Sequence, residues 1–292
     1  MSKKILITYV NYNKNKNKLI KNFFINNKGF DKIIIWNPEL LNTYDKNLKW
    51  TVKNYYNKYK KYASSTVKIN KSWAENGFLI WKPHIIHLTL KKFSEEGDTI
   101  FYHDSDFIKY PRYKKNLSNV YLNFIKSYNI KSVNIFQDSE KPLHTDCKPY
   151  LLEKYFKNFF DNGLYLNGFW AGAIILKNNN FSIRFINQWK KITTLKNCAP
   201  HPFNLKNSKL AEDFNVAHSN EQATLAVNYY INYRFSKNIN FFYVPMRLII
   251  NINFSSIKYL KNFLKLKLIN NNFLRFTKFY LNIFLKKIEN LI

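Results

Sequence analysis

The 292-residue sequence has few of the residues that break, bend or cross-link a chain: 6 glycines, 8 prolines and 2 cysteines. The two cysteines, Cys147 and Cys198, are too few for a disulfide framework and lack metal-ligand spacing, so we expect a reducing, intracellular setting. No apolar run is long enough to span a bilayer, and the apolar stretch at the N-terminus is too short for a signal peptide. These shortages predict a cytoplasmic protein, and the length of 292 residues suits one large α/β domain or two smaller ones.

Acidic residues are also scarce, since 18 Asp and Glu oppose 47 Lys and Arg and leave a formal charge of +29. A charge of this size is typical of proteins that bind nucleic acid or anionic membranes. Most of it comes from lysine, however, while arginine, which base-reading proteins use for bidentate contacts, is rare. Lys, Asn, Ile, Phe and Tyr are abundant along the whole chain, as in proteins of AT-rich genomes. The charge therefore favours phosphate-bearing ligands or lipid surfaces and argues against nucleic-acid recognition.

What the sequence does contain is an alternation of short apolar segments with helical patterns, in a chain that is 46% hydrophobic. Strands are predicted at residues 4–10, 31–36, 99–103, 133–137, 168–176 and 241–244. Helices are predicted at residues 19–26, within 45–76, and at 83–93, 119–128, 153–160, 180–192 and 220–233. A turn is predicted at residues 37–38 and a loop at 198–211. Strand, helix and strand in succession predict a mainly parallel sheet covered by helices.

Two carboxylates follow the buried strand at residues 99–103. Asp104 and Asp106 are one residue apart where the chain leaves this strand, and oxygen ligands of this kind suit Mg²⁺ or Mn²⁺. A divalent ion on a diphosphate neutralises the charge that develops when a sugar leaves its nucleotide. The carboxyl ends of the strands of such a sheet form its ligand crevice, so we predict a metal site there. The alternative is two solvated aspartates in a loop.

A resemblance extends this prediction. The segment that begins at Gly77, GFLIWKPHIIHLTLKKFSEEGDTIFYHDSDF, resembles the core of bacterial and viral GT-A glycosyltransferases, in which a G-[FY]-x-x-W-K-P helix precedes a G-D strand and a D-x-[DA] motif. Residues 167–176 (NGFWAGAIIL), followed by a helix containing Trp189, and residues 219–229 (SNEQATLAVNY) are similar to two later parts of that family. The resemblance runs from residue 4 to residue 245. It implies a GT-A fold, with a Rossmann-like, mixed and mainly parallel sheet flanked by helices, in a catalytic domain of residues 1–255.

The resemblance also implies which residues surround the donor, a UDP- or GDP-sugar. Asp104 and Asp106 would hold Mn²⁺ or Mg²⁺, and His218 is the candidate for a third, late histidine ligand. Nucleotide contacts are predicted for Tyr9, Asn11, Lys82, His103 and Ser105. Contacts with the sugar or the acceptor are predicted for Trp170, Ala171, Gly172 and Gln222. For Lys82 and His218, a solvated surface position is the alternative.

The catalytic base is less well defined. An inverting transferase needs a carboxylate that takes the proton from the acceptor hydroxyl, whereas a retaining enzyme does not. Asp213 and Glu221 are the main candidates, beside Glu212, and each has an alternative as a solvated acid or a helix cap. Relatives carry D-Q-S or D-Q-D where this chain has E-Q-A from Glu221 to Ala223, so the second polar group of that motif is missing.

The last part of the chain, residues 256–292, predicts a basic helical tail in which Lys alternates with Leu, Ile and Phe at helical spacing. Such amphipathic helices lie on membrane surfaces, which would place the protein at the inner face of a membrane. The alternative is that the same apolar faces pack on the catalytic domain or on a partner chain.

Three functions fit the sequence. The leading one is metal-dependent transfer of a sugar from a nucleotide-diphosphate sugar to a glycan, lipid-linked or protein acceptor. A metal-dependent phosphoryl transferase or nuclease would use the same aspartates, but it predicts a further cluster of acidic ligands, for which residues 212–213 are the candidate. A non-catalytic, basic membrane- or nucleic-acid-binding protein with a degenerate transferase fold would explain the altered E-Q-A motif.

Overall fold

The structure is a computed structural model that describes residues 2–10, 28–48, 79–105, 125, 129–143, 147, 149–156, 167–198, 220–232 and 237–242. Several sequence predictions lie outside these residues: the helix at 19–26, most of the helical region at 45–76 and of the helix at 119–128, the loop after residue 198, and the tail at 256–292. No helix within the described ranges is long and apolar enough to cross a bilayer.

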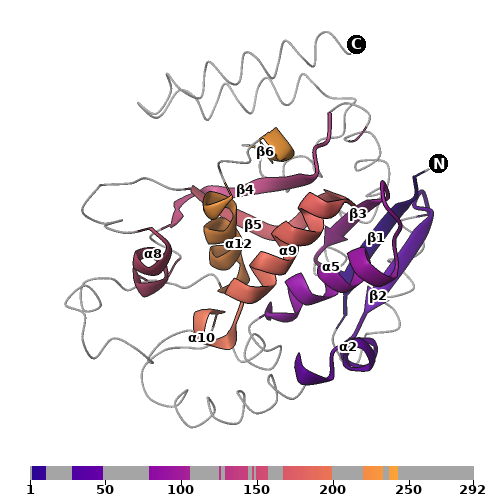
Figure 1. Cartoon of the computed structure of the whole chain (residues 1–292), viewed down its shortest axis with the longest axis horizontal. Helices are drawn as coiled ribbons and strands as arrows, with labels where there is room; N and C mark the ends of the chain where they lie inside the picture. Colours follow the sequence, from indigo (N-terminus) through magenta and orange to yellow (C-terminus); the bar gives the residue numbers. More distant parts are fainter. Residues whose placement is uncertain are drawn as a thin grey trace.

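One six-stranded sheet organises the described chain, in the order β2-β1-β3-β5-β4-β6 (Figure 1). Its strands are β1 (Lys4–Tyr9), β2 (Lys32–Trp36), β3 (Thr99–His103), β4 (Val133–Pro142), β5 (Asn167–Lys177) and β6 (Ile239–Phe242). β1 pairs in parallel with β2 and β3, and β4 pairs in parallel with β6. β5 alone runs antiparallel to its neighbours, β3 and β4. The predicted α/β fold with a mixed, mainly parallel sheet is confirmed.

Strand position explains the hydrophobic pattern of each segment. β3 is buried at all five positions because both of its faces are covered, as its continuous apolar run predicts. Ile100 and Tyr102 join the main core, whereas Phe101 packs against Phe30, with ring centroids 5.0 Å apart. β2, at the sheet edge, instead alternates between buried and half-buried residues.

The described helices are α2 (Pro38–Tyr44), α5 (Trp81–Lys92), α8 (Pro149–Tyr155), α9 (Asn180–Ile192), α10 (Leu195–Cys198) and α12 (Asn220–Ile231). α9 has the predicted bounds, while α5 and α8 begin before the predicted residues. The turn predicted at residues 37–38 is wrong, because these residues start a helix. Asn37 caps α2 by accepting a hydrogen bond from the backbone N–H of Leu40 at 2.8 Å, and Pro38 occupies the first turn, where its missing N–H costs nothing.

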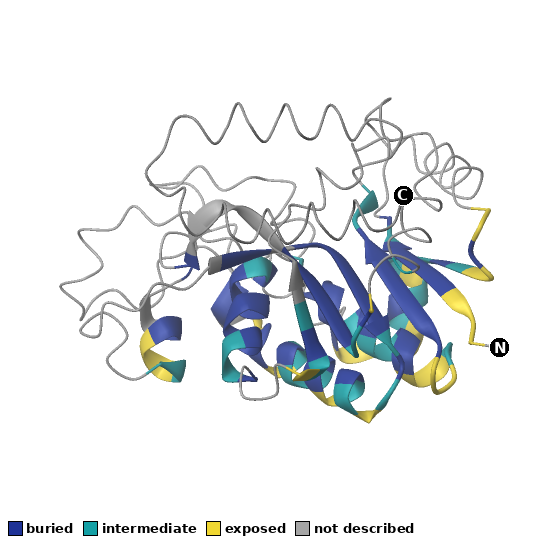
Figure 2. Cartoon of the chain, turned by 90° about the horizontal axis from the view of Figure 1, so that it is seen from above, coloured by how far each residue is buried: buried dark blue, intermediate teal, exposed yellow. Residues whose placement is uncertain are grey.

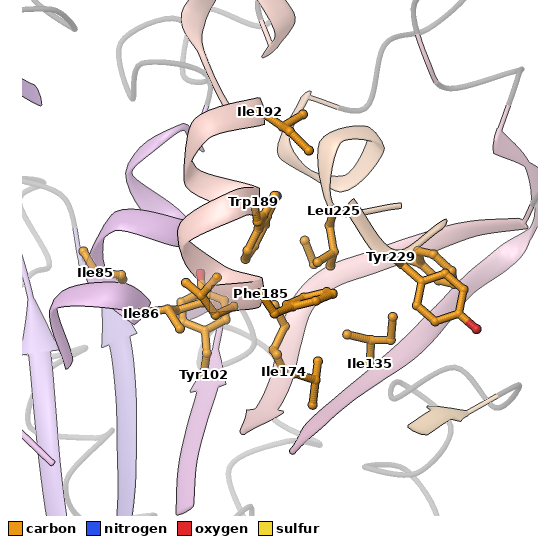
Figure 3. Packing of buried hydrophobic residues seen from close by; sticks show 14 of the residues in the cluster. Ile85, Ile86, Tyr102, Ile135, Ile174, Phe185, Trp189, Ile192, Leu225 and Tyr229 are labelled. Atoms are coloured by element: carbon orange, nitrogen blue, oxygen red, sulfur yellow. The ribbon is translucent and has the colours of Figure 1, made fainter. Parts of the chain in front are cut away.

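The core lies between the sheet and the helices α5, α9 and α12, which cover one face of the sheet (Figures 1 and 2). Figure 3 shows aromatic and branched side chains of these helices pointing toward the strands. Phe185 and Trp189 of α9 meet Leu225 of α12 above Ile174 of β5. This packing fixes the first turns of α5 and α12 relative to the end of β3, which positions the candidate site.

Candidate active site

The carboxyl end of β3 is held firmly between its two neighbouring strands. The hydroxyl of Thr8 in β1 donates a hydrogen bond to the carbonyl oxygen of His103 at 2.7 Å, and both residues are buried. One residue further, the backbone N–H of Asp104 donates to the carbonyl oxygen of Gly172 in β5 at 2.8 Å. These bonds leave the Asp104 side chain at the edge of the sheet, 29% exposed.

Lys82 brings three distant segments of the chain together at this edge. It lies in the first turn of α5, and its side chain is only 1% exposed. Its Nζ atom is 2.5 Å from Oε1 of Glu221 in the first turn of α12, and 3.1 Å from Oδ1 of Asp104. One buried ammonium group therefore bridges two carboxylates, one of them buried and the other reaching solvent.

Aromatic rings complete the surroundings of this ammonium group. Lys82 Nζ lies 5.4 Å from the ring centroid of Tyr102 and 6.0 Å from that of Trp81, within the range of cation–π attraction. The hydroxyl of Tyr102 donates a hydrogen bond to Oδ1 of Asp104. Lys82 and Tyr102 thus hold the Asp104 carboxylate from the core side.

The charges of this cluster depend on one another. Burial lowers the pKa of Lys82, but attraction by Asp104 and Glu221 outweighs it, so the pKa is raised and the side chain stays cationic. Burial raises the pKa of Glu221, although Lys82 opposes this shift. Oε2 of Glu221 is buried and has no hydrogen-bond partner among the described residues. Neighbouring His103 is also fully buried, which lowers its pKa to about 4 and keeps it neutral at physiological pH.

Among the described residues, Asp104 has the type of ligand atom that a hard divalent cation prefers. Asp104 offers carboxylate oxygens at a partly open position, and Mg²⁺ usually takes one or two carboxylates together with waters and substrate phosphates. Within the described ranges, no group of three or more His, Cys, Asp or Glu side chains is arranged to hold a metal. The other predicted ligands, Asp106 and His218, lie outside those ranges, so the complete metal site stays a prediction.

Aromatic stacking builds the side of the site next to β1. The rings of Tyr9, at the end of β1, and Trp81, at the start of α5, stack with centroids 3.8 Å apart and planes 18° apart. Tyr9, a predicted nucleotide contact, is half-buried and lies in β1, the strand next to β3. Ser105, another predicted nucleotide contact, follows Asp104 and is also half-buried. Asn11, the remaining predicted nucleotide contact, lies outside the described residues.

The residues predicted on the sugar side are only partly described. Ala171 and Gly172 lie in β5 beside the end of β3, and Gln222 is half-buried next to Glu221 on α12. The Trp170 backbone pairs with Phe136, but its side chain is not described. The candidate base Asp213 and its neighbour Glu212 also lie outside the described residues.

Sequence reasoning missed the residues that hold α12 in place. The indole N–H of Trp189 in α9 donates to Oγ1 of Thr224 at 3.1 Å, and Thr193 Oγ1 lies 2.9 Å from the same oxygen. Thr224 in turn donates to the carbonyl oxygen of Glu221 at 2.9 Å. The Trp-containing helix was visible in the sequence as a pattern, but its partner Thr224, 35 residues later, was not.

Comparisons with known proteins add little to this geometry. No family model matches the sequence, and no curated protein matches it. Among solved structures, that of mouse xyloside xylosyltransferase 1 in its apo form is similar, at 10% sequence identity and a TM-score of 0.39, over 82% of this chain and 72% of that one. A likeness this low carries no argument about function.

Proposed function

We propose that the protein is a metal-dependent glycosyltransferase that moves a sugar from a nucleotide-diphosphate sugar to a glycan, lipid-linked or protein acceptor. The observation that supports this most is the partly exposed Asp104 carboxylate at the carboxyl end of a central strand, beside Tyr9 at the end of the neighbouring parallel strand. Open α/β sheets bind nucleotides at such strand ends. The resemblance of the W-K-P helix and the D-S-D segment to GT-A enzymes points to the same reaction.

Asp104, Asp106 and His218 would hold the cation, Mn²⁺ or Mg²⁺. When bound, such an ion offsets the negative charge that develops on the departing diphosphate. The hydroxyl of Tyr102 orients the Asp104 carboxylate from the core side, so this ligand is already held in place before the donor binds, while the Lys82 ammonium shares the charge of the same carboxylate. The Lys82 side chain is buried and already paired with two carboxylates. We therefore assign it to Asp104 and Glu221 instead of to a phosphate of the nucleotide.

The donor would extend along the edge of the sheet from β1 toward β5. Tyr9 has one ring face against Trp81 and, with Asn11, would meet the base and ribose of a UDP- or GDP-sugar. Ser105 is half-buried and would line the diphosphate, whereas the predicted contact of His103 is not retained because this residue is as deeply buried as Lys82. Contacts with the sugar and acceptor would come from β5, through Trp170, Ala171 and Gly172, and from α12, through Gln222.

An acceptor hydroxyl must lose its proton in an inverting reaction. Asp213 is the preferred candidate for this base. Glu221 has Oε1 on the Lys82 ammonium and is 2% exposed, so its geometry supports a structural partnership with Lys82 more than direct proton transfer.

Thermal unfolding with nucleotide diphosphates tests this function. We expect UDP or GDP to raise the Tm of the full chain in the presence of Mn²⁺ and much less without it, because ligand binding stabilises the folded state. Asp104→Asn and Asp106→Asn should abolish the shift. Glu95→Gln, which changes an exposed carboxylate before β3, is the matched control and should retain it. A shift that survives in both aspartate variants would refute the metal site.

A further inference from the structure

The ammonium of Lys82 is shared unequally between its two carboxylates. It is 2.5 Å from Oε1 of Glu221, but 3.1 Å from Oδ1 and 3.4 Å from Oδ2 of Asp104. Glu221 is almost fully buried, whereas Asp104 reaches solvent. The ion pair of Lys82 with Glu221 is thus the shorter and the less solvent-exposed of the two, and Asp104 is the second partner of the same ammonium group.

We propose that Glu221 is a positioning residue that controls how strongly Asp104 binds a cation, because it shares the Lys82 ammonium with Asp104 and holds that ammonium at the shorter distance. This inference rests on the proposed function, in which Asp104 is a ligand of the metal that carries the nucleotide-diphosphate donor. Glu221 itself touches neither the metal nor the donor. It acts through Lys82.

Two features of α12 keep Glu221 in this role. Its carboxylate lies in the first helical turn, where the positive end of the helix dipole favours an anion. Thr224 fixes the same turn by donating to the Glu221 carbonyl oxygen, and Trp189 of α9 fixes Thr224. The anion is therefore held where Lys82 needs a counter-charge.

Loss of the Glu221 charge would change the balance at Asp104. Lys82 is 1% exposed, so its ammonium cannot turn to water, and Asp104 would be its one remaining carboxylate partner among the residues that the structure describes. A divalent cation would then compete for the carboxylate oxygens of Asp104 with an ammonium group that no longer pairs with Glu221. Loss of both charges would leave Asp104 with its Tyr102 hydrogen bond and free of that competition.

The test compares Mn²⁺-dependent binding of UDP to the full-length wild type, Glu221→Gln and the double variant Lys82→Met/Glu221→Gln, by titration calorimetry. We expect Glu221→Gln to weaken binding roughly tenfold, since a charge change within a few ångströms of a ligand is felt strongly at an effective dielectric constant near 20. The double variant should recover wild-type affinity or exceed it. Glu221→Asp, which keeps the charge but withdraws it by one methylene group, should lie between the wild type and Glu221→Gln.

A direct role for Glu221 in binding gives a different pattern. If Glu221 contacts the metal or the donor, removal of Lys82 cannot rescue Glu221→Gln, and equal weakness of the single and double variants overturns the proposal. Absence of Mn²⁺-dependent UDP binding by the wild type would instead refute the metal site of the proposed function itself. Lys82→Gln/Glu221→Gln, a polar pair of similar size, replaces the double variant if the methionine version does not fold.

Discussion

At the scale of single residues, the buried Lys82 ammonium cannot exchange its carboxylate partners for water. Lys82→Met should therefore destabilise the fold by about 3–5 kcal/mol, because Glu221 would remain buried near Asp104 without a counter-charge. Lys82→Met/Glu221→Gln should regain most of this loss, since both buried charges are removed together. Urea unfolding of the full chain measures both values.

An exposed ion pair provides the control for this cycle. Lys3 and Glu95 lie 3.3 Å apart with side chains 52% and 80% exposed, and Lys3→Met should change stability by less than about 1 kcal/mol. Loss of stability in the Lys82 double variant as large as in Lys82→Met would show that the cost comes from packing and not from an unpaired charge.

His103 predicts a specific pH dependence of stability. Burial lowers its pKa from 6.5 to about 4 in the folded protein, so between these values the unfolded chain binds more protons. Stability therefore falls as the pH drops through this window, by up to about 3 kcal/mol for the full shift. His103→Gln should flatten the curve of unfolding free energy against pH there. His87 is half-buried and its pKa is also lowered to about 4, so His87→Gln should flatten the curve in the same window, and the two substitutions together should flatten it more than either alone. An unchanged slope in His103→Gln would contradict the assignment.

The sequence showed the candidate site residues more clearly than it showed which of them contact one another in the fold. Lys82 and Asp104 stood out because they belong to motifs within one short segment. Glu221 lies 139 residues after Lys82, and only the docking of α12 on the sheet brings the two together. Local patterns therefore predicted the candidates for a site, while the ion pair that joins them depends on tertiary packing.

At the scale of elements, the strands and long helices were predictable because burial on both faces of a strand, or one face of a helix, leaves a clear pattern. β3 and α9 match their predicted bounds for this reason. α2 was missed because an Asn-Pro pair is typical of both a turn and a capped helix start. α10, four residues long, is too short to show a helical period.

The junction of α9 and α12 gives a prediction at this scale. Thr224→Val removes the acceptor of the Trp189 indole N–H and the bond to the Glu221 carbonyl, and should cost about 1–3 kcal/mol because a buried donor loses its partner. Thr43→Val removes an exposed hydroxyl bonded to Glu39 and should cost less than about 0.5 kcal/mol. Chemical denaturation compares the two. Equal effects would mean that Thr224 does not anchor α12.

At the scale of the whole molecule, the class of fold was predictable but the strand order was not. Alternating strands and helices predicted a mainly parallel sheet. The antiparallel insertion of β5 between β3 and β4 depends on contacts between segments far apart in the chain, which hydrophobic patterns do not encode. This insertion places Gly172 beside Asp104 and so completes the edge of the site.

The tail at residues 256–292 lies outside the described residues, and its membrane contact stays a prediction of the sequence. We expect deletion after residue 255 to reduce co-sedimentation with anionic liposomes severalfold, because basic amphipathic helices bind through apolar area and attraction to anionic lipids. Hydrogen exchange at residues 2–10 and 79–105 should stay unchanged if the first 255 residues keep their fold without the tail. Equal liposome binding by the truncated chain would remove the membrane role.

The central claim is that this site cleaves a nucleotide-diphosphate sugar with the help of a metal bound at Asp104. A donor-hydrolysis panel over the common UDP- and GDP-sugars, with Mn²⁺ and without an acceptor, tests it most directly. We predict slow release of UDP or GDP from at least one donor, dependent on Mn²⁺ and lost in Asp104→Asn but retained in Glu95→Gln. Mn²⁺-dependent release that is as fast in Asp104→Asn as in the wild type, or no release from any donor, would contradict the claim.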